Sequence, residues 1–543
     1  MISKINRNEP PLDSGDSGQH SSNIPSPVVL ILGLPGSGKT TVGERLASAL
    51  GWEFISIGNL IRASLVESNL CLDDIDIWRA LRGERKFNGA WIGELLSRAL
   101  SRRSAAGPLI IDAGPAFDDA IANIQLDFLC TLFIAAPDNM RRRRFLSRNR
   151  VDTDSASISL EALFDMRSTL YRNELNSLIR CSSPAPFISI ENTGDIKLAL
   201  YQSLSAVTIS YSIAKLRHIP NPTILADKSQ ALSDLYKECT NICATVSQPS
   251  GATVALSSPH FDLSGGRLTM LIKWGSVFSP VLLDYVRKRL FDAGYFVSRM
   301  RVLNGAAIRA SGLVRAHLGL HYILARWGNL LCPFIPNGAS DDRVYHSAFS
   351  LAERYGNRQL RTWWYGNAGR IRREGRGFWC VNSDDLPGII INGHIPSIVD
   401  ESECLDSHTV ALEIAEHRRF PATPLAALRE TFLGASDPEK AVSGSLRSMA
   451  FHKKLGIEST INIEKNVFHL SGGYLEAKRE AMIWFDSNPS GCRSPINREH
   501  NGTCMCMAID RPIGNGSNWT FSLTEGKEFT EVSNELRHIT CPF

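Results

Sequence analysis

A glycine-rich segment that follows an apolar run near the N-terminus constrains the fold of this chain more than any other feature. Residues 28–32 are continuously apolar, and the segment from Gly33 through Gly38, Lys39 and Thr40 then matches the pattern G-x-x-x-x-G-K-[ST]. Apolar residues recur at helical spacing directly afterwards. The segment therefore predicts a buried strand, a tight loop and a helix, with backbone N–H groups and the helix N-terminus arranged around phosphate oxygens.

This loop also predicts the contacts of a bound nucleotide, which we expect to be ATP with Mg²⁺. Lys39 is expected to reach the β- and γ-phosphates, and Thr40 to bind the Mg²⁺ ion. Asp112 ends a later apolar run, 108–112, and its carboxylate is a second expected Mg²⁺ ligand. The residues expected to line the phosphates are Gly33, Gly36, Ser37, Gly38, Lys39, Thr40 and Thr41.

Further apolar runs of strand length extend this pattern. They lie at 52–57, 108–112, 128–136 and 186–190 and alternate with helical stretches, which predicts a doubly wound α/β domain around a parallel sheet. The order of these elements, over roughly residues 27–200, resembles the adenylate kinase family of nucleoside monophosphate kinases.

The resemblance to adenylate kinases implies further phosphate ligands. Arg62 stands where the family has a phosphate-binding arginine in its monophosphate-binding helix. The arginine-rich segment 141–154 resembles the family's hinge and lid region, which implies phosphate contacts for Arg144, Arg148 and Arg150. A charge-rich helix can equally be a solvated face, so both interpretations of this segment stay open.

The chain departs from that family on the acceptor side. Segment 109–117 resembles the family's D-G-F-P-R segment, but Ala116 stands in place of the arginine, and Ile57 replaces a threonine. The resemblance therefore implies ATP binding and leaves monophosphate kinase activity open.

A second motif lies much later in the chain. Asn466 is followed by His469, Ser471, Glu480 and then Trp484. Earlier segments of the same region supply a lysine in the strand-like run 269–275 and an arginine in a G-S-L-R sequence. This ordered set resembles nucleoside diphosphate kinases, which implies an α+β ferredoxin-like domain and a phosphohistidine intermediate.

The second resemblance assigns a role to each of these side chains. His469 would carry the phosphoryl group, and Glu480 would hold its ring in one tautomer. Lys273 and Arg447 would neutralise the transferring group, and Asn466 would bind the nucleotide. Further candidates that the resemblance implies are Arg429, which lies one residue further from Gly434 than in the family, Ser436, and Tyr322 as the tyrosine beside the histidine.

The second region also departs from its family. Gly472 replaces an aspartate, and an insertion spans about residues 304–407 where ordinary members have a short helical hairpin. Its segment 361–380 is rich in Trp, Tyr and Arg, which fits either stacking on a nucleic acid or, as we favour, an aromatic-pinned loop that covers the site. A catalytically degenerate nucleotide-binding module with a regulatory or scaffold role is the alternative to an enzyme.

Composition narrows the setting of this 543-residue chain. A net charge of +4 argues against nucleic acid and membrane binding, and no apolar run reaches the roughly twenty residues of a membrane span. The 12 cysteines are scattered, and the polar N-terminus lacks a signal-peptide core, so we expect a reducing cytoplasm.

The expected partners are ATP and nucleoside mono- and diphosphates, and a homo-oligomer through the second domain stays open. The expected organisation is a disordered leader at 1–26, an adenylate kinase-like domain at 27–205, a connector with one helix at 206–264, a nucleoside diphosphate kinase-like domain at 265–487, and a tail of unassigned role at 488–543.

Overall fold

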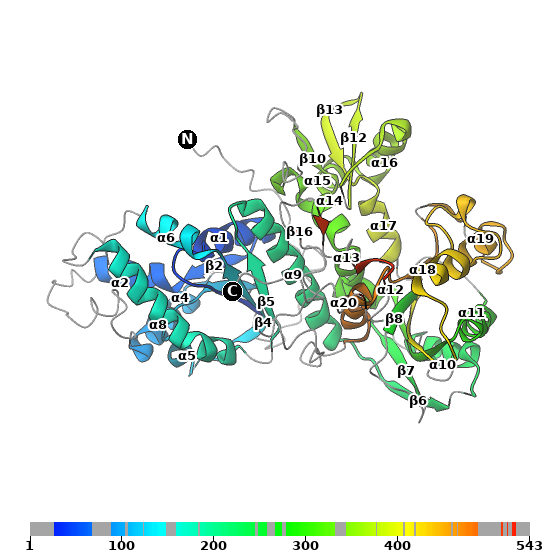
Figure 1. Ribbon diagram of the computed structural model, residues 1–543, viewed down its shortest axis with the longest axis horizontal. Coiled ribbons are helices and arrows are strands. Elements are labelled where there is room, and N and C mark those ends of the chain that lie inside the picture. Colours follow the sequence, from blue (N-terminus) through cyan, green and yellow to red (C-terminus); the bar gives the residue numbers. More distant parts are fainter. Residues whose placement is uncertain are drawn as a thin grey trace. The chain divides into compact units, whose positions relative to one another are not determined.

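The chain divides into two units in this computed structural model, with the boundary between Ser210 and Tyr211 (Figure 1). The expected leader, most of the expected tail, Arg148 and Arg150 lie outside the residues that the structure describes. The described residues are 27–67, 88–147, 159–331, 344–486, 512–513, 518–519, 524–527 and 531, less short gaps at 104–106, 123, 183–184, 228, 245–247, 258–266, 274–278, 376, 405–407, 418–419, 458–459 and 464.

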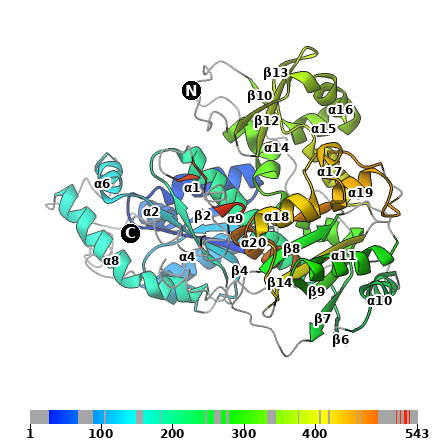
Figure 2. The same ribbon diagram turned by 45° about the vertical axis from the view of Figure 1, so that its right-hand side comes forward.

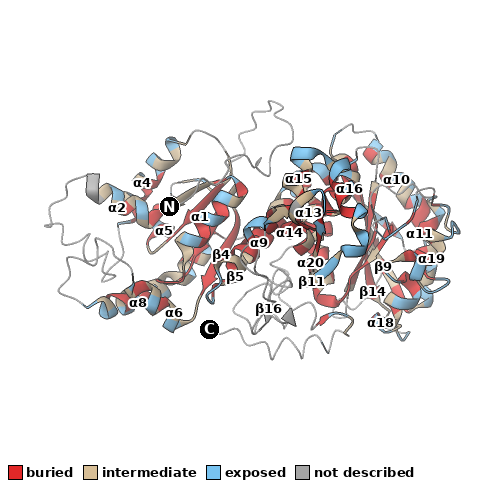
Figure 3. Cartoon of the chain, turned by 90° about the horizontal axis from the view of Figure 1, so that it is seen from above, coloured by how far each residue is buried: buried red, intermediate tan, exposed pale blue. Residues whose placement is uncertain are grey.

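The first unit is built on a five-stranded sheet in the order β2-β3-β1-β4-β5, and every strand pair is parallel. The central strands β1 and β3 are buried almost throughout rather than at alternate residues, because a parallel sheet is covered by helices on both faces (Figure 3). The predicted doubly wound sheet is therefore confirmed. Its strands are β1 Pro27–Leu32, β2 Glu53–Ser56, β3 Leu109–Asp112, β4 Asp127–Ala135 and β5 Phe187–Glu191.

Helices connect these strands, and the last of them, α9, continues into the second unit. Helix α1 begins at Lys39, directly after the glycine-rich loop, so its N-terminus points at that loop. The helices of this unit are α1 Lys39–Leu50, α2 Ile57–Glu67, α4 Gly89–Ser101, α5 Phe117–Ala120, α6 Asp138–Leu146, α8 Leu160–Cys181 and α9 Ile196–Arg217.

The second unit contains a six-stranded sheet in the order β15-β8-β14-β9-β7-β6 (Figure 2). Four of its strands follow one another in the chain as β8, β9, β14 and β15, and each pairs antiparallel with its neighbours. One helix, α11, joins the first two, and helical turns precede the last. The elements are β6 Thr223–Asp227, α10 Leu232–Ala244, β7 Gly251–Ser257, β8 Arg267–Ile272, α11 Val281–Asp292, β9 Tyr295–Asn304, β14 His408–Glu416, α18 Leu425–Ala427, the π-helix η2 Leu428–Leu433, the 3₁₀ turn η3 Pro438–Lys440, α19 Leu446–Phe451, β15 Phe468–Leu470 and α20 Tyr474–Phe485.

The two faces of this sheet differ in character. On β8, Met270 and Ile272 lie in the hydrophobic core beside α10 and α11 residues. Thr269 and Leu271 point to the opposite face, because side chains alternate along a strand. His469 is paired with Leu271 across β15 and β8 and so shares that opposite face. Helix α20 covers this face, since the Thr269 hydroxyl donates to the Ala477 carbonyl at 3.3 Å.

The expected connector at 206–264 contributes two strands to the large sheet of the second unit. Its predicted helix is present as α10, but Thr223–Asp227 and Gly251–Ser257 are strands of the large sheet. β6 pairs parallel with β7, and β7 pairs antiparallel with β9. The sequence G-A-T-V-A-L-S mixes strand formers with glycine, alanine and serine, and its pairing with β9 supplies the order that this local signal lacks.

The insertion folds into a layer of its own rather than a loop. Four strands in the order β10-β13-β12-β11 pack with helices, and Trp363 and Trp364 are buried among them. These tryptophans therefore serve the core of the insertion. Its elements are α12 Gly305–Ser311, α13 Leu313–Leu318, α14 Leu320–Leu331, β10 Tyr345–Ser347, α15 Ala348–Tyr355, α16 Asn357–Gly366, the 3₁₀ turn η1 Ala368–Arg370, β11 Arg372–Gly375, β12 Phe378–Ser383, β13 Leu386–Ile391 and α17 Ile395–Ser402.

Two further features complete the described part of the chain. Pro512–Ile513 and Asn518–Trp519 form the short antiparallel pair β16 and β17. Among the described residues, no helix combines the length and the apolar character that a membrane crossing requires.

Candidate functional sites

The glycine-rich loop of the first unit has backbone geometry that only glycine adopts without strain. Gly33, Gly36 and Gly38 have φ values of 151°, 79° and 92°. A Cβ at Gly36 would lie 2.1 Å from the Arg141 carbonyl oxygen, and one at Gly33 would lie 2.6 Å from that of Ile134. The predicted loop therefore closes tightly against β4 and α6 before α1 begins.

Lys39 and Thr40, the first two residues of α1, contact the glycine-rich loop and the end of β3. The Lys39 ammonium donates to the Gly33 carbonyl at 2.8 Å and lies 4.7 Å from the centre of the Tyr171 ring. The Thr40 hydroxyl donates to Asp112 Oδ2 at 2.6 Å, because β1 and β3 are adjacent parallel strands that end together. This pair offers only oxygen atoms, and such a donor set fits Mg²⁺.

The arginine-rich segment brings one of its predicted ligands to the loop. Arg144 approaches the Ser37 carbonyl at 3.5 Å and the Asn192 carbonyl at 3.3 Å. Arg141, which was not predicted, is buried and donates to the Pro35 carbonyl at 3.3 Å. Burial lowers the pKa of both guanidinium groups. The helix therefore has two arginines on the loop side, rather than a wholly solvated face.

Asn192 is a contact of the loop that sequence reasoning missed. It directly follows β5, is buried, and donates from Nδ2 to the Ser37 carbonyl at 2.7 Å. A polar residue directly after the last strand of a parallel sheet was the available signal, because ligands gather at the carboxyl ends of such strands.

Other predicted residues of this unit lie apart from the loop's contacts. Arg62 donates to the Gly58 carbonyl at 2.7 Å and to Asn59 Oδ1 at 3.3 Å, both on its own helix. Thr41 is exposed on α1. Ala116 is buried in the core and has a φ of 67° directly before α5.

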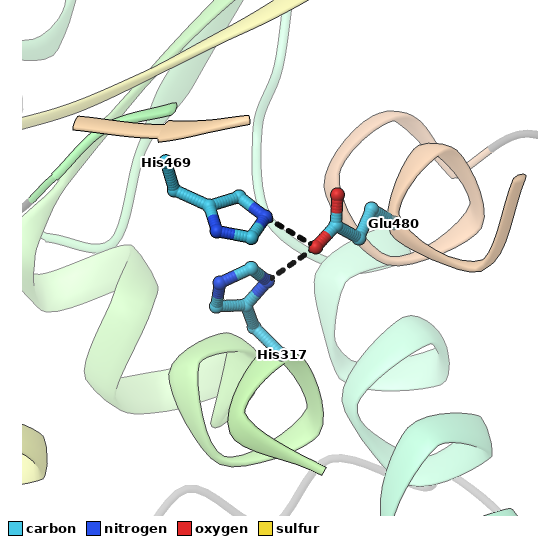
Figure 4. Close-up of side chains that lie close together, drawn as sticks. All are labelled: His317, His469 and Glu480. Atoms are coloured by element: carbon cyan, nitrogen blue, oxygen red, sulfur yellow. Dashed lines mark hydrogen bonds and ion pairs between the residues drawn. The ribbon is translucent and has the colours of Figure 1, made fainter. Parts of the chain in front are cut away.

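The predicted histidine and glutamate of the second unit lie together (Figure 4). His469 Nε2 is 2.6 Å from Glu480 Oε1, and the Ser471 hydroxyl donates to Glu480 Oε2 at 2.6 Å. Ser471 is fixed in turn by the Thr269 N–H, which donates to its hydroxyl at 3.0 Å. Strand β15 supplies the histidine and α20 the glutamate, so the sequence separation between them is bridged by one strand–helix turn.

A second histidine, His317 on α13, shares this carboxylate. Its Nδ1 lies 3.4 Å from Glu480 Oε1, and its ring is 4.6 Å from the His469 ring at an angle of 88°. The Trp484 indole N–H lies 3.4 Å from the same nitrogen. Tyr322 instead packs on Trp327 and Phe349, so its predicted place beside His469 was wrong. The insertion, where the family resemblance gave no guide, supplies His317.

The cationic candidates gather around the backbone that leads to His469. Lys273 forms a hydrogen bond to Asn466 Oδ1, and its backbone N–H donates to the Val467 carbonyl at 2.7 Å. Arg447 donates to the Phe468 carbonyl at 2.8 Å and to the Gly434 carbonyl at 2.9 Å. These contacts tie the predicted lysine, asparagine and arginine to the segment just before the histidine.

That segment is strained. Val467 has a φ of 55°, a rare value for a β-branched residue, and the Phe468 N–H donates across it to the Asn466 carbonyl at 2.5 Å. This is a γ-turn with a left-handed central residue, which costs of order 1–3 kcal/mol and persists only where its surroundings impose it. Two contacts impose it here: the Lys273 backbone N–H binds the Val467 carbonyl, and the Arg447 side chain binds the Phe468 carbonyl.

Arg429 reaches the same site by way of a π-helix. Its spacing from Gly434 is one residue longer than the resemblance implies, and the Gly434 N–H donates to the Arg429 carbonyl at 3.0 Å, five residues back. The wider turn absorbs the extra residue. The Arg429 guanidinium donates to the Gly472 carbonyl at 3.4 Å and pairs with Glu525 at 3.1 Å. Ser436 is exposed, and its carbonyl accepts from Asn466 Nδ2 at 3.4 Å.

Burial sets the protonation states of this second site. It lowers the pKa of His469 to about 3 and that of His317 to about 3, so both rings are neutral at pH 7. Burial and the Arg447 charge lower the pKa of Lys273 to about 7, and burial raises the pKa of Glu480. A neutral imidazole keeps the lone pair that a nucleophile or a metal ligand needs.

Comparisons with known proteins bear on the first unit. A family profile described as an AAA domain matches residues 32–160. A shikimate kinase from Corynebacterium jeikeium is 25% identical over 164 residues, which are 30% of this chain and 83% of that protein. A cytidylate kinase from Ignicoccus hospitalis is 28% identical over 129 residues, which are 24% of this chain and 69% of that protein. The solved structure of TT1252 from Thermus thermophilus is 22% identical and covers 34% of this chain and 96% of its own, but its TM-score of 0.23 is too low to equate the folds. With the parallel sheet and the loop geometry, the sequence similarities mark the first unit as a kinase-like P-loop nucleotide-binding domain.

Proposed function

We propose that this protein is a nucleotide phosphotransferase with two separate phosphate-handling sites. In the second unit, His469 would accept the γ-phosphoryl group of a nucleoside triphosphate and pass it to a nucleoside diphosphate. In the first unit, the P-loop would bind ATP with Mg²⁺ and serve a kinase reaction. The observation that carries the proposal is the His469–Glu480–Ser471 arrangement, a buried nucleophile with an orienting carboxylate that is itself held in place.

The chemistry follows from the tautomer that this arrangement favours. With Glu480 ionised, its oxygens accept, so the His469 Nε2–H donates and Nδ1, which faces away from Glu480, has the lone pair (Figure 4). Nδ1 attacks the γ-phosphorus, an N–P bond forms, and the bond to the β–γ bridging oxygen breaks as the nucleoside diphosphate leaves. A β-phosphate oxygen of a second diphosphate then attacks the phosphorus, and the N–P bond breaks. Glu480 stabilises the positive ring between the two steps.

The fold of the second unit supports this proposal. The strands β8, β9, β14 and β15 lie in the spatial order fourth, first, third and second, with helical segments after the first and before the fourth. This order supports the β-α-β-β-α-β arrangement that the proposal expects of a ferredoxin-like domain, with β6 and β7 as additional strands. The insertion replaces the hairpin that ordinarily sets base preference, so the proposal specifies no base.

The acceptor of the first unit is the second part of the proposal. The two relatives are named for different acceptors, shikimate and cytidylate, so we propose an acceptor among nucleoside monophosphates and other small hydroxyl compounds. Ala116 provides no charge for an acceptor phosphate, which favours weak monophosphate kinase activity. A panel of CMP, AMP and shikimate with ATP and Mg²⁺, read as ADP release, tests this part.

The proposal for the second unit is tested by incubating the full chain with ATP and Mg²⁺ and measuring the intact mass. An acid-labile, base-stable phosphate adduct is expected, and a nucleoside diphosphate should discharge it. His469→Ala should abolish the adduct, whereas His452→Ala, at an exposed histidine of the same unit, should keep it. If wild-type protein binds nucleotide but stays unlabelled, the enzyme proposal fails for this unit.

One observation favours the alternative, a catalytically degenerate regulatory or scaffold module. Arg429, a candidate phosphate ligand, is already paired with the carboxylate of Glu525. A module of this kind would bind nucleotide without forming the adduct, and the mass measurement separates the two functions.

A further inference from the structure

We propose that His317, His469 and Glu480 form a binding site for a divalent transition metal ion of the Zn²⁺ class. One ligand atom from each residue lies within 4.8 Å of the other two. Two imidazole nitrogens with one carboxylate oxygen are a donor set that favours zinc and its neighbours over Mg²⁺ or Ca²⁺. Three protein ligands leave a fourth position for water or another small ligand.

The distances from the two histidines to Glu480 lie near those in a tetrahedral site, and all three ligand atoms lie within 4.8 Å of one another. Bonds of about 2.0–2.1 Å to a tetrahedral Zn²⁺ place ligand atoms roughly 3.3 Å apart. His317 Nδ1 and Glu480 Oε1 are 3.4 Å apart. His469 Nε2 and Glu480 Oε1 are 2.6 Å apart, so this pair would open slightly as an ion replaced the proton between them. Figure 4 shows both rings directing a nitrogen at the same carboxylate oxygen.

The surroundings suit an ion that enters and leaves. Glu480 and His317 are 1% and 7% exposed, so they form the inner wall of the cluster, whereas the His469 side chain is 20% exposed and offers the way in. Ser471 holds the far oxygen of Glu480, which limits the movement of this ligand. The weak contact of the Trp484 N–H with His317 Nδ1, at 3.4 Å, would give way to the ion.

The proposed phosphotransfer does not account for His317. A phosphohistidine needs one partner that fixes its tautomer, and Glu480 already fills that role. A second buried histidine at the same oxygen adds the cost of desolvating another polar ring. A metal ion uses all three side chains and so gives the second histidine a function.

Metal binding and phosphorylation of His469 would exclude each other, a consequence that rests on the proposed function. An ion at Nε2 uses the lone pair of that nitrogen, so the single proton of the neutral ring moves to Nδ1. Nδ1 then lacks the lone pair that attacks phosphorus. Micromolar Zn²⁺ would therefore inhibit the second site, while the oxygen-lined Mg²⁺ site of the first unit would be unaffected.

Metal binding is tested directly, without turnover, by titrating the metal-free full chain with Co²⁺. Wild-type protein should show visible d–d bands that saturate and that Zn²⁺ abolishes by displacement. His317→Gln should weaken the affinity by roughly tenfold or more, and His452→Gln should behave as wild type. Equal binding by wild type and His317→Gln overturns the proposal.

X-ray absorption of wild-type protein with one equivalent of Zn²⁺ keeps the test decisive if His317→Gln folds poorly. The first shell should contain two imidazole nitrogens and oxygen without sulfur, and a sulfur-containing shell overturns the site. Zn²⁺ should also prevent the ATP-dependent mass adduct in wild type, with about tenfold more Zn²⁺ needed in His317→Gln. Absence of any adduct without metal refutes the phosphotransfer proposal alone, because the Co²⁺ titration does not depend on it.

Discussion

The P-loop of the first unit and the histidine site of the second are held in place in different ways. The loop is a contiguous segment whose geometry comes from glycine backbone and from the helix that follows, and Lys39 and Thr40 occupy adjacent positions in it. The histidine site is assembled from Lys273, which directly follows β8, and from side chains on β15, α13, α19 and α20. A local motif therefore fixes the first site, whereas tertiary packing fixes the second.

The two sites should therefore respond differently to side-chain substitutions. The loop exposes backbone donors that no single side-chain substitution removes, so its variants should lose charge and keep shape. In the histidine site the Arg447 side chain binds the Phe468 carbonyl beside the strained turn at Val467, so a substitution of Arg447 can alter shape and charge together. Charge-only changes are thus the cleaner probes of both.

The largest expected effect comes from crossing one variant of each site. His469→Ala should eliminate the phosphate adduct and leave ATP binding by the first unit intact. Lys39→Ala should weaken ATP binding there by about 1.5–3 kcal/mol, roughly ten- to a hundredfold, and leave the adduct intact, because each site lies within its own unit. Intact mass and nucleotide titration of both variants provide the readouts. Loss of the adduct in Lys39→Ala would mean that the sites are not independent.

Asp112→Asn should lower the affinity of the first site for Mg²⁺. The amide oxygen can still accept from Thr40, so the hydrogen bond at 2.6 Å survives while the negative charge is lost. The Mg²⁺ concentration for half-maximal ATP binding should rise roughly tenfold. Ser56→Ala is the matched control, because that hydroxyl is 3.4 Å from the same carboxylate and makes the weaker contact. Equal Mg²⁺ curves for Asp112→Asn and wild type would contradict the metal assignment.

Sequence reasoning went furthest where function lies in contiguous residues. The five strands and the loop were predictable because apolar runs, glycine spacing and the lysine–threonine pair are local signals. Asn192 was not found, because its contact with Ser37 depends on where β5 lies in the sheet, and strand order is a tertiary property. The Arg62 side chain donates to the Gly58 carbonyl of its own helix, and the family resemblance alone could not reveal this side-chain conformation.

The second unit separates local from tertiary information more sharply. His469 and Glu480 lie one strand and one helix apart, so a short pattern sufficed to pair them. His317 is distant in sequence and lies within the insertion, and only the packing of α13 beside α20 brings it to the same carboxylate. β7 was missed because Gly251, Ala252 and Ala255 weaken its local strand signal and its pairing with β9 is a tertiary contact.

The pH dependence of His469 phosphorylation should reveal the charge of Lys273. Its pKa is lowered to about 7 from 10.5, so the ammonium is charged below pH 7 and loses its proton as the pH rises through that value. The rate of adduct formation at low ATP should therefore fall, by up to roughly tenfold, between pH 6.5 and 8.5. Lys273→Arg should flatten this fall, since guanidinium keeps its charge across the range. Identical profiles for the two proteins would remove Lys273 from the phosphate-binding role.

The smallest expected effect concerns the contact between the C-terminal segment and the second site. Glu525 pairs with Arg429 at 3.1 Å, and the Gly526 N–H donates to the Gly472 carbonyl at 2.7 Å. The segment therefore occupies Arg429, the arginine that the proposed phosphotransfer would use to bind the nucleotide. A half-exposed pair of this kind contributes about 0.2–1 kcal/mol, so Glu525→Gln should tighten nucleotide binding at the second site by about 1.5- to 5-fold. Glu430→Gln, on the same π-helix and exposed, removes a charge without touching the pair and should change little. The gain should shrink as salt screens the pair, because exposed charges are the ones that salt weakens most. A gain that is equal in both variants and independent of salt would show that general charge, rather than competition for Arg429, controls access to the histidine site.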